Sequence, residues 1–499
     1  MADHFQYRGL DPSRREIRIL RIAPGRGLEP VRCSVSHVSF YDKECPQYEA
    51  ISYAWDHEGI TAGIFLDDQP FTIPASAEQA LRRMRYADAV RTLWIDAVCI
   101  NQADLVEKGE QVARMDEVYW KADEEAEFDR LLARIVLANT VPESVSVQLL
   151  PLYNSPWFGR LWVVQEVALA ARCLAFAGTN ELEWSDVVQV GWWLMWNSKR
   201  FRSEHRRARV FANLSRCMEI SKYTGRGLGH CMLHLQAFDV TDPRDHVYGV
   251  LGLARRISVD PSSLDALYPD YAKEFDEVLR DSTLVDIAQT QSLYILHKVW
   301  HPVVTLPDDH FSSWTPRWDH EINGDEECAF FRSGYWADNG ILWEPPSPSF
   351  HPRDLRVLGC TIGSIACATR IMWSRMIHDS AQFAELLQDV DVLVATSSYI
   401  QPHEEVISRT LVADWSFKPL GRLQGSEAIG KHTELYVELR RDLTAGTDTT
   451  NVLALQQSST ELDEYRYGIW WYCGNRRIFR TECGRVGLGP QAMLEQDQG

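Results

Sequence analysis

The sequence predicts an α/β protein with a parallel sheet in its first half, and three observations support that class. Between residues 16 and 121, strand-like and helix-like patterns follow the order strand, hairpin, helix, strand, helix, which is typical of α/β proteins. The apolar run at 93–95 has helical patterns on both sides, as buried parallel strands do. The contents of 45% hydrophobic and 24% charged residues are ordinary for a globular protein.

Three strands and a hairpin are expected before the first helix. Residues 16–22 alternate between apolar and polar side chains and end at a turn. The segments 31–40 and 48–55 are also strand-prone. Residues 64–73 predict a hairpin whose turn contains Asp67 and Asp68.

Two capped helices are expected on either side of a buried strand. Ser76 and Gln79 have the spacing of a capping box, which predicts a helix N-terminus there. The strand follows at 91–96. Asp104, with Glu107 three residues later, predicts the start of the next helix.

The rest of the chain departs from the regular pattern. A further apolar strand is expected after Ala122, but an acidic stretch follows instead. Either another segment supplies this strand or the sheet is one strand short. Residues 271–296 predict a helix, and beyond residue 300 short strand-like pieces appear, such as 390–394 and 467–472. The expected organisation is a strand-rich lead-in at 1–47, an α/β domain at 48–185, a helical region at 186–300 and a mixed α+β region at 301–499.

Composition and charge argue against several classes of partner. The net charge is −19, from 51 basic and 70 acidic residues, and such a field repels nucleic acids and anionic membranes. No uncharged apolar run approaches the roughly 18 residues that a membrane span needs. The 11 Cys include no C-x-x-C pair, which fits reduced thiols in the cytoplasm. The N-terminus does not resemble a secretory signal.

Candidate binding residues follow the strand at 91–96. Ligands of open α/β sheets collect beyond the carboxyl ends of such strands, which is where Asp96, Asn101 and Gln102 lie. The alternative is that Asp96 caps a turn and the two amides satisfy the backbone of the loop. From this stretch alone we favour the alternative.

Glu166 is a second candidate, because it stands in the apolar helical stretch 160–170 without a helical ion-pair partner. Such a carboxylate either turns to solvent or lines a pocket, where desolvation raises its pKa. From the residues alone the solvated orientation is expected.

The sequence contains none of the common phosphate-binding, hydrolase or zinc-protease motifs, and two other polar clusters have simpler explanations. The sequence holds no phosphate-binding P-loop, no G-x-S-x-G and no H-E-x-x-H. His230 and His234 have helical spacing, but no carboxylate stands at a familiar offset, so we expect no metal site. Asp242 and Asp245 around Pro243 are explained by the capping of a helix, and a catalytic role is not expected for them.

Four stretches follow one another in the first part of the chain: Tyr48-Glu-Ala-Ile-Ser-Tyr-Ala-Trp55, Leu93-Trp-Ile-Asp-Ala-Val-Cys-Ile-Asn-Gln102, Gln111-Val-x-x-Met115 with Tyr119, and Trp157-Phe-x-Arg-Leu-Trp-Val-Val-Gln-Glu166. Together they resemble one family, the fungal heterokaryon-incompatibility (HET) domain. Downstream, 242–253 and 479–490 resemble segments that commonly follow this domain. Asp56 stands where the family usually has Gly.

The resemblance implies a signalling protein in non-self recognition and programmed cell death, acting through protein partners or self-association. HET domains are considered distant relatives of TIR domains, which have a flavodoxin-like parallel sheet. Some TIR domains cleave NAD with a glutamate on a helix that follows a Trp-containing turn. By that analogy Glu166 would be catalytic, with NAD as substrate and Trp157 and Trp162 available to stack on a ring. The same crevice would be lined by Ser52, Tyr53, Trp55, Asp96, Asn101 and Gln102.

Three functions therefore stand side by side. The first is signalling without catalysis, the second is an NAD glycohydrolase that uses Glu166, and the third is a degenerate, inactive relative. The absence of a dinucleotide fingerprint favours the first over the second, and the missing strand gives weight to the third. A cleft shared by Glu166, Asp96 and Trp55 would favour the enzyme.

Overall fold

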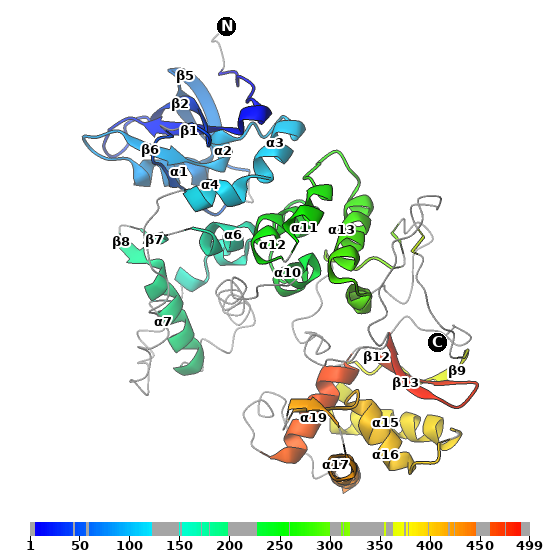
Figure 1. Cartoon of the computed structure of the whole chain (residues 1–499). Helices are drawn as coiled ribbons and strands as arrows, with labels where there is room; N and C mark the ends of the chain where they lie inside the picture. The colour runs from blue at the N-terminus through cyan, green and yellow to red at the C-terminus, as the bar shows by residue number, and fades with distance from the viewer. Residues whose placement is uncertain are drawn as a thin grey trace. The chain divides into compact units, whose positions relative to one another are not determined.

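A computed structural model of the 499-residue chain gives the fold (Figure 1). The chain divides into two compact units, Met1–Thr290 and Gln291–Gly499, which are described separately. The structure describes residues 5–121 without 43–44 and 56–58; 149 and 152–197 without 171 and 179; 227–299 without 259; 311–319 without 313; 354–355; and 363–490 without 374–375, 378, 398, 418–419, 424, 446–459 and 475.

The first unit contains a mixed six-stranded sheet in the order β3-β6-β1-β2-β4-β5. Only the pairs β3–β6 and β2–β4 are parallel, and the other neighbours are antiparallel. The expected α/β class is confirmed in this mixed form, but the described sheet is not parallel throughout. The strands are β1 (Glu16–Ile22), β2 (Arg32–Ser39), β3 (Glu49–Ala50), β4 (Thr61–Leu66), β5 (Gln69–Pro74) and β6 (Arg91–Trp94).

The neighbours of β6 in the sheet differ from those of a strand in a fully parallel sheet. β6 was expected to be a buried parallel strand, and Leu93 and Trp94 are indeed buried. It is parallel to β3, but its other neighbour is β1, which runs antiparallel to it with Leu20 opposite Leu93. The strand expected at 48–55 is only the two-residue β3. The hairpin is confirmed, since Asp67 and Asp68 both take positive φ, as a tight turn of this kind requires.

Of the two predicted helix starts, one is confirmed and one is wrong. Helix α3 (Leu105–Val112) begins after Asp104, whose carboxylate accepts the backbone N–H groups of Val106 and Glu107 at 3.0 and 3.1 Å. Helix α1 (Ala75–Met84) begins directly after β5, with Pro74 as N-cap and no capping side chain. Because the strand runs straight into the helix, Ser76 already lies in its first turn.

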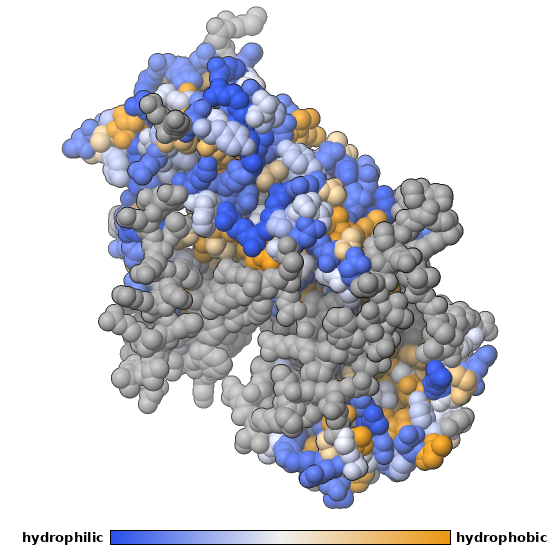
Figure 2. Space-filling model, viewed as in Figure 1, coloured by the Kyte–Doolittle hydropathy of each residue, from blue (hydrophilic) through white to orange (hydrophobic). Residues whose placement is uncertain are grey.

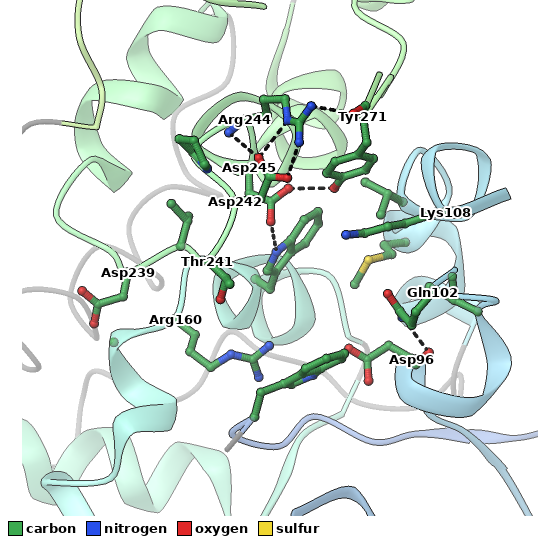
Figure 3. Close-up of a pocket in the computed structure, with 18 of the residues that line it drawn as sticks. Asp96, Gln102, Lys108, Arg160, Asp239, Thr241, Asp242, Arg244, Asp245 and Tyr271 are labelled. Atoms are coloured by element: carbon green, nitrogen blue, oxygen red, sulfur yellow. Dashed lines mark hydrogen bonds and ion pairs between the residues drawn. The ribbon is translucent and has the colours of Figure 1, made fainter. Parts of the chain in front are cut away.

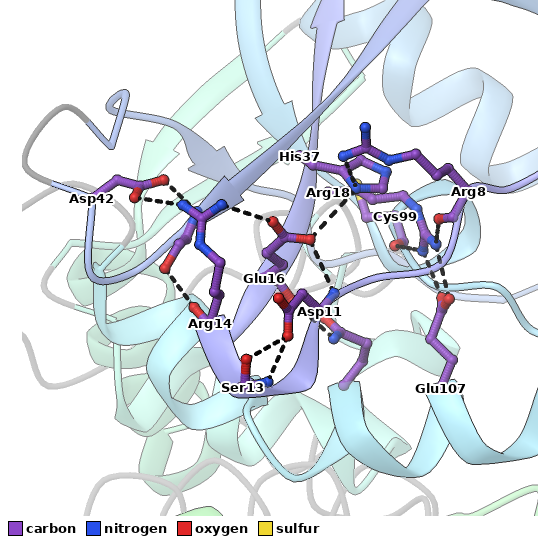
Figure 4. Close-up of polar contacts among 12 residues, drawn as sticks. Arg8, Asp11, Ser13, Arg14, Glu16, Arg18, His37, Asp42, Cys99 and Glu107 are labelled. Atoms are coloured by element: carbon purple, nitrogen blue, oxygen red, sulfur yellow. Dashed lines mark hydrogen bonds and ion pairs between the residues drawn. The ribbon is translucent and has the colours of Figure 1, made fainter.

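A buried ion pair joins the N-terminal strand to α3 (Figure 4). The guanidinium of Arg18 on β1 donates to both carboxylate oxygens of Glu107, at 2.5 and 2.8 Å. It also donates to the backbone carbonyls of Cys99 and Arg8, at 3.1 and 2.7 Å. The residues before position 48 therefore belong to the same sheet as β6 and are held to the helix that follows it.

Helices and a hairpin complete the first unit. The predicted helix at 271–296 appears as α13, which begins after an irregular turn at 271–274. The segment where the additional strand was expected after Ala122, and Asp56, lie outside the described residues. The elements are α2 (Asp96–Cys99), α4 (Met115–Lys121), a 3-10 turn η2 (Pro156–Gly159), α6 (Trp162–Ala168), β7 (Leu174–Ala177), β8 (Asn180–Glu183), α7 (Trp184–Asn197), α10 (Leu228–Leu235), α11 (Asp245–Tyr248), α12 (Leu251–Ile257) and α13 (Phe275–Thr290).

The second unit combines helices with a small antiparallel sheet. The strands expected at 390–394 and 467–472 are wrong, because both segments lie inside helices. Phe383, Leu387, Val390 and Val394 recur at helical spacing and are buried together, so a short window of branched residues was mistaken for a strand. The elements are α15 (Ser380–Ala395), α16 (His403–Leu411), α17 (Ser426–Ala445), α19 (Glu461–Cys473) and the sheet of β13 (Val486–Pro490), β12 (Arg476–Thr481) and β9 (Ile365–Ala368).

The surface agrees with the acidic, charged composition. On the face seen in Figure 2, the described residues of the first unit are mostly hydrophilic, with small apolar areas between them. None of the helices in the described ranges is long and apolar enough to cross a membrane.

Candidate functional site

A cavity of about 830 Å³ opens in the first unit between three groups of residues (Figure 3). One wall is the end of β6 with α2, α3 and α4, the second is the segment 154–162, and the third comprises 239–245 and 271–275. Its size is within the range of small-molecule sites. Of the residues expected at the site, Trp55, Asp96, Gln102 and Trp162 line it.

Asp96 occupies the position where β6 passes into the short helix α2. One carboxylate oxygen accepts the Ala97 N–H at 2.7 Å, and the other accepts Nε1–H of Trp55 at 3.1 Å. The Gln102 amide donates to the Asp96 carbonyl at 3.1 Å. Burial raises the pKa of Asp96, although the nearby Arg160 charge opposes this. Asp96 is the first residue of α2, whose N-cap is Ile95 without a capping side chain, and its carboxylate lines the cavity.

Asn101 has the local role that the alternative interpretation gave it. Its side-chain oxygen accepts the Ala103 N–H at 3.3 Å, and its own N–H donates to Glu107 at 2.7 Å. It is not among the residues that line the cavity.

Glu166 is buried on α6, with 6% of its surface exposed. The Ser52 hydroxyl donates to its carboxylate, and Nε1–H of Trp157 donates to Ser52 Oγ at 2.7 Å. Burial raises its pKa to about 7, and the Arg160 charge and the Ser52 hydrogen bond limit the rise. The solvent-facing orientation expected from the residues alone is therefore wrong. Glu166, Ser52 and Trp157 form a connected group that does not itself line the cavity.

Arg160 connects this group with the cavity. It lines the cavity, and its guanidinium donates to the Tyr53 carbonyl. Its positive charge limits the rise that burial causes in the pKa values of Asp96 and Glu166. The Tyr53 ring stacks on Trp55 with centroids 6.3 Å apart. Sequence reasoning had not singled out Arg160.

Sequence reasoning assigned the aspartates of 242–245 to helix capping and missed their place at the cavity. The predicted cap is wrong, because α11 begins at Asp245 with Arg244 as N-cap and no capping side chain. Asp242 instead accepts the Arg244 N–H at 3.0 Å and holds the Arg244 guanidinium with two bonds of 2.9 and 2.8 Å. Burial opposes ionisation, but the hydrogen bonds and charge of Arg244 keep the pKa of Asp242 low. Asp242, Arg244 and Asp245 all line the cavity.

Asp245 joins α11 to α6. Its carboxylate accepts Nε1–H of Trp162 at 3.2 Å and the hydroxyl of Tyr271 at 2.7 Å. Burial raises its pKa to about 6, while these two hydrogen bonds oppose the rise. The signal for this contact is absent from local sequence, because Trp162 and Asp245 are 83 residues apart.

Lys108 brings α3 to the third wall. Its ammonium lies 4.2 Å from the centroid of the Tyr271 ring. At the next position, a Cβ on Gly109 would be 2.2 Å from the carbonyl oxygen of Pro269. The absence of a side chain thus lets α3 pack directly on the loop that carries Tyr271.

The histidine pair of α10 shows no metal-site geometry in the described chain. The rings of His230 and His234 lie with centroids 4.3 Å apart. Over the described ranges, no three or more His, Cys, Asp or Glu residues are grouped as ligands of a metal ion.

A cavity with mixed polar and apolar lining, at the end of a sheet strand and enclosed by helices, defines an α/β domain with a ligand-sized site. Residues 48–126 match the model of the family described as heterokaryon incompatibility protein (HET). The resemblance found in the sequence is thereby confirmed for this segment of the chain. No curated protein and no solved structure matches the chain. The matched segment contributes Trp55, Asp96, Gln102 and Lys108 to the cavity.

Proposed function

We propose that this protein acts in heterokaryon incompatibility as a signalling protein of non-self recognition and programmed cell death. The observation that carries the proposal is the HET match over residues 48–126. We place the protein in the cytoplasm, because the eight cysteines among the described residues are all free thiols.

In this proposal the HET domain acts through a protein partner or through self-association. Two apolar residues in the first turn of α3 support an interaction surface, since Val106 is 73% and Leu105 is 50% exposed. Contact with another protein would remove these apolar side chains from water, which is energetically favourable.

A second candidate is an NAD glycohydrolase of the TIR type. Glu166 does not share the cavity with Asp96 and Trp55, which counts against this candidate, but one observation supports it. Glu166 is buried and hydrogen-bonded to Ser52, and Arg160 acts electrostatically both on it and on Asp96 at the cavity wall. In this reaction the nicotinamide leaves with the electrons of its bond to ribose, and water adds to the ribose carbon. An ionised Glu166 would stabilise the positive charge of the ribose or orient the water. The relation to flavodoxin-like TIR sheets is part of this candidate and rests on the HET resemblance, not on strand directions.

Expression from an inducible promoter in a fungal host tests the proposal and separates the candidates. The wild type, Glu166→Gln and the matched control Glu183→Gln, a residue in a surface ion pair with Arg172, are compared for growth arrest and cellular NAD. Signalling without catalysis predicts arrest by all three at unchanged NAD. Arrest with NAD loss that only Glu166→Gln abolishes would establish the glycohydrolase. No arrest by abundant, folded wild-type protein would contradict both and leave a degenerate relative.

A further inference from the structure

The charges that line the cavity nearly cancel. Its five carboxylates belong to Asp96, Asp239, Asp242, Asp245 and Glu274, and its four cations to Lys108, Arg160, Arg244 and Lys273. Several of these charges already have partners: Arg244 holds Asp242 through bonds of 2.9 and 2.8 Å, and Lys273 pairs with Asp281 at 2.8 Å. A charged ligand would lose its hydration there without meeting a net opposite charge. The lining therefore favours an uncharged ligand.

Uncharged donors and acceptors of hydrogen bonds also line the cavity. The Thr241 hydroxyl and the Asn154 amide form no side-chain hydrogen bond with any described residue. The Gln102 amide donates to the Asp96 carbonyl at 3.1 Å, which leaves its side-chain oxygen as an acceptor. Figure 3 places Thr241 and Gln102 on opposite sides of the cavity. Hydroxyl groups of a ligand suit such a lining, because each hydroxyl both donates and accepts.

Two indole rings offer apolar surface to the same cavity. Nε1–H of Trp55 donates to Asp96 at 3.1 Å, and Nε1–H of Trp162 donates to Asp245 at 3.2 Å. Because an indole has only this one donor, both rings have only apolar surface left for a ligand. The Tyr53 ring stacks on Trp55 with centroids 6.3 Å apart and so supports the indole. Rings fixed before a ligand arrives lose little entropy on binding.

We propose that this cavity binds a neutral sugar, with the C–H face of the sugar ring against the Trp55 indole and its hydroxyl groups toward Thr241, Asn154 and Gln102. A sugar ring combines an apolar C–H face, which packs on an aromatic ring, with hydroxyl groups that donate and accept. A volume of about 830 Å³ can hold a sugar of one or two rings. The inference goes beyond the proposed signalling function and requires no catalysis by Glu166.

Calorimetric titration of the full chain with neutral sugars tests this site, and it needs neither growth arrest nor NAD cleavage. The probes are glucose, galactose, mannose, N-acetylglucosamine, maltose and cellobiose, of which at least one should bind. Mannitol has the hydroxyl groups without a ring, and glucose 6-phosphate adds negative charge, so both should bind more weakly than the best neutral sugar. The inference is overturned if none of the sugars binds at millimolar concentration, or if mannitol or glucose 6-phosphate binds more tightly than all of them.

Two substitutions of Trp55 separate the role of its ring from that of its N–H group. Trp55→Phe and Trp55→Leu both lose the hydrogen bond to Asp96, but only Trp55→Phe keeps a flat ring. Trp55→Leu should weaken binding of the best sugar by about tenfold or more, and Trp55→Phe should weaken it clearly less. Equal binding by these two variants would overturn the packing of the sugar on the indole.

Thr241→Val tests the hydroxyl contacts with little risk to the fold, because the Thr241 hydroxyl has no partner among the described residues. It should weaken sugar binding by about threefold or more. The matched control is Trp120→Leu on α4, since Trp120 is 48% exposed and does not line the cavity. Circular dichroism verifies the fold of each variant. The assignment of the site is overturned if Thr241→Val binds like the wild type, or if Trp120→Leu weakens binding as much as Trp55→Leu.

Discussion

Replacing Arg18 with Met should destabilise the first unit more than any surface arginine can. The Arg18 side chain is 1% exposed and that of Glu107 is 8% exposed. The guanidinium makes two hydrogen bonds to Glu107 and two to backbone carbonyls. Its removal leaves a carboxylate buried without its counter-charge. Loss of one partner from such a pair costs about 3–5 kcal/mol.

Urea unfolding followed by circular dichroism measures this loss, and hydrogen exchange localises it to β1 and α3. Arg21→Met is the matched control, because Arg21 is the exposed position of the same strand, and it should change stability by less than about 0.5 kcal/mol. Combining Arg18→Met with Glu107→Gln removes the stranded charge, so the double variant should be more stable than Arg18→Met alone. A cost below about 1 kcal/mol for Arg18→Met, or a double variant that is no better, would refute the argument.

Two further predictions concern the cavity region. The pKa of Glu166 is about 7, above its unfolded value of about 4.3, so the folded protein holds this proton more tightly and loses stability as pH rises through that window. The stability of Glu166→Gln relative to wild type should therefore grow by roughly 3 kcal/mol between about pH 4.5 and pH 8 in urea unfolding, and parallel pH profiles would contradict this. Gly109→Ala should destabilise by about 2 kcal/mol or more through its clash, whereas Gly430→Ala in α17, whose Cβ meets nothing within 4 Å, should stabilise by about 1 kcal/mol. Thermal unfolding that moves both variants in one direction would count against the packing of α3 on its loop.

The sequence alone determined the features that depend on neighbours along the chain. The Asp67–Asp68 turn, the Asp104 cap and the alternation of β1 are set by backbone preferences and by side chains a few residues apart. The ordered motifs of the HET family are likewise visible without coordinates, and they placed Trp55, Asp96, Gln102 and Trp162 among the candidates. All four line the cavity.

Only the tertiary structure decided what depends on residues distant in sequence. Strand direction in the sheet follows from β6 lying next to β1, and the alternation of side chains carries no information about that choice. Glu166 is buried because Ser52, 114 residues earlier, lies against its carboxylate. The sequence assigned Asp245 to helix capping, and its contacts with Trp162 and Tyr271 appear only in the folded structure. Local chemistry predicts turns, caps and some of the elements. Burial and charge pairing at the cavity arise only when the chain brings distant segments together, because desolvation depends on everything that surrounds a group in space.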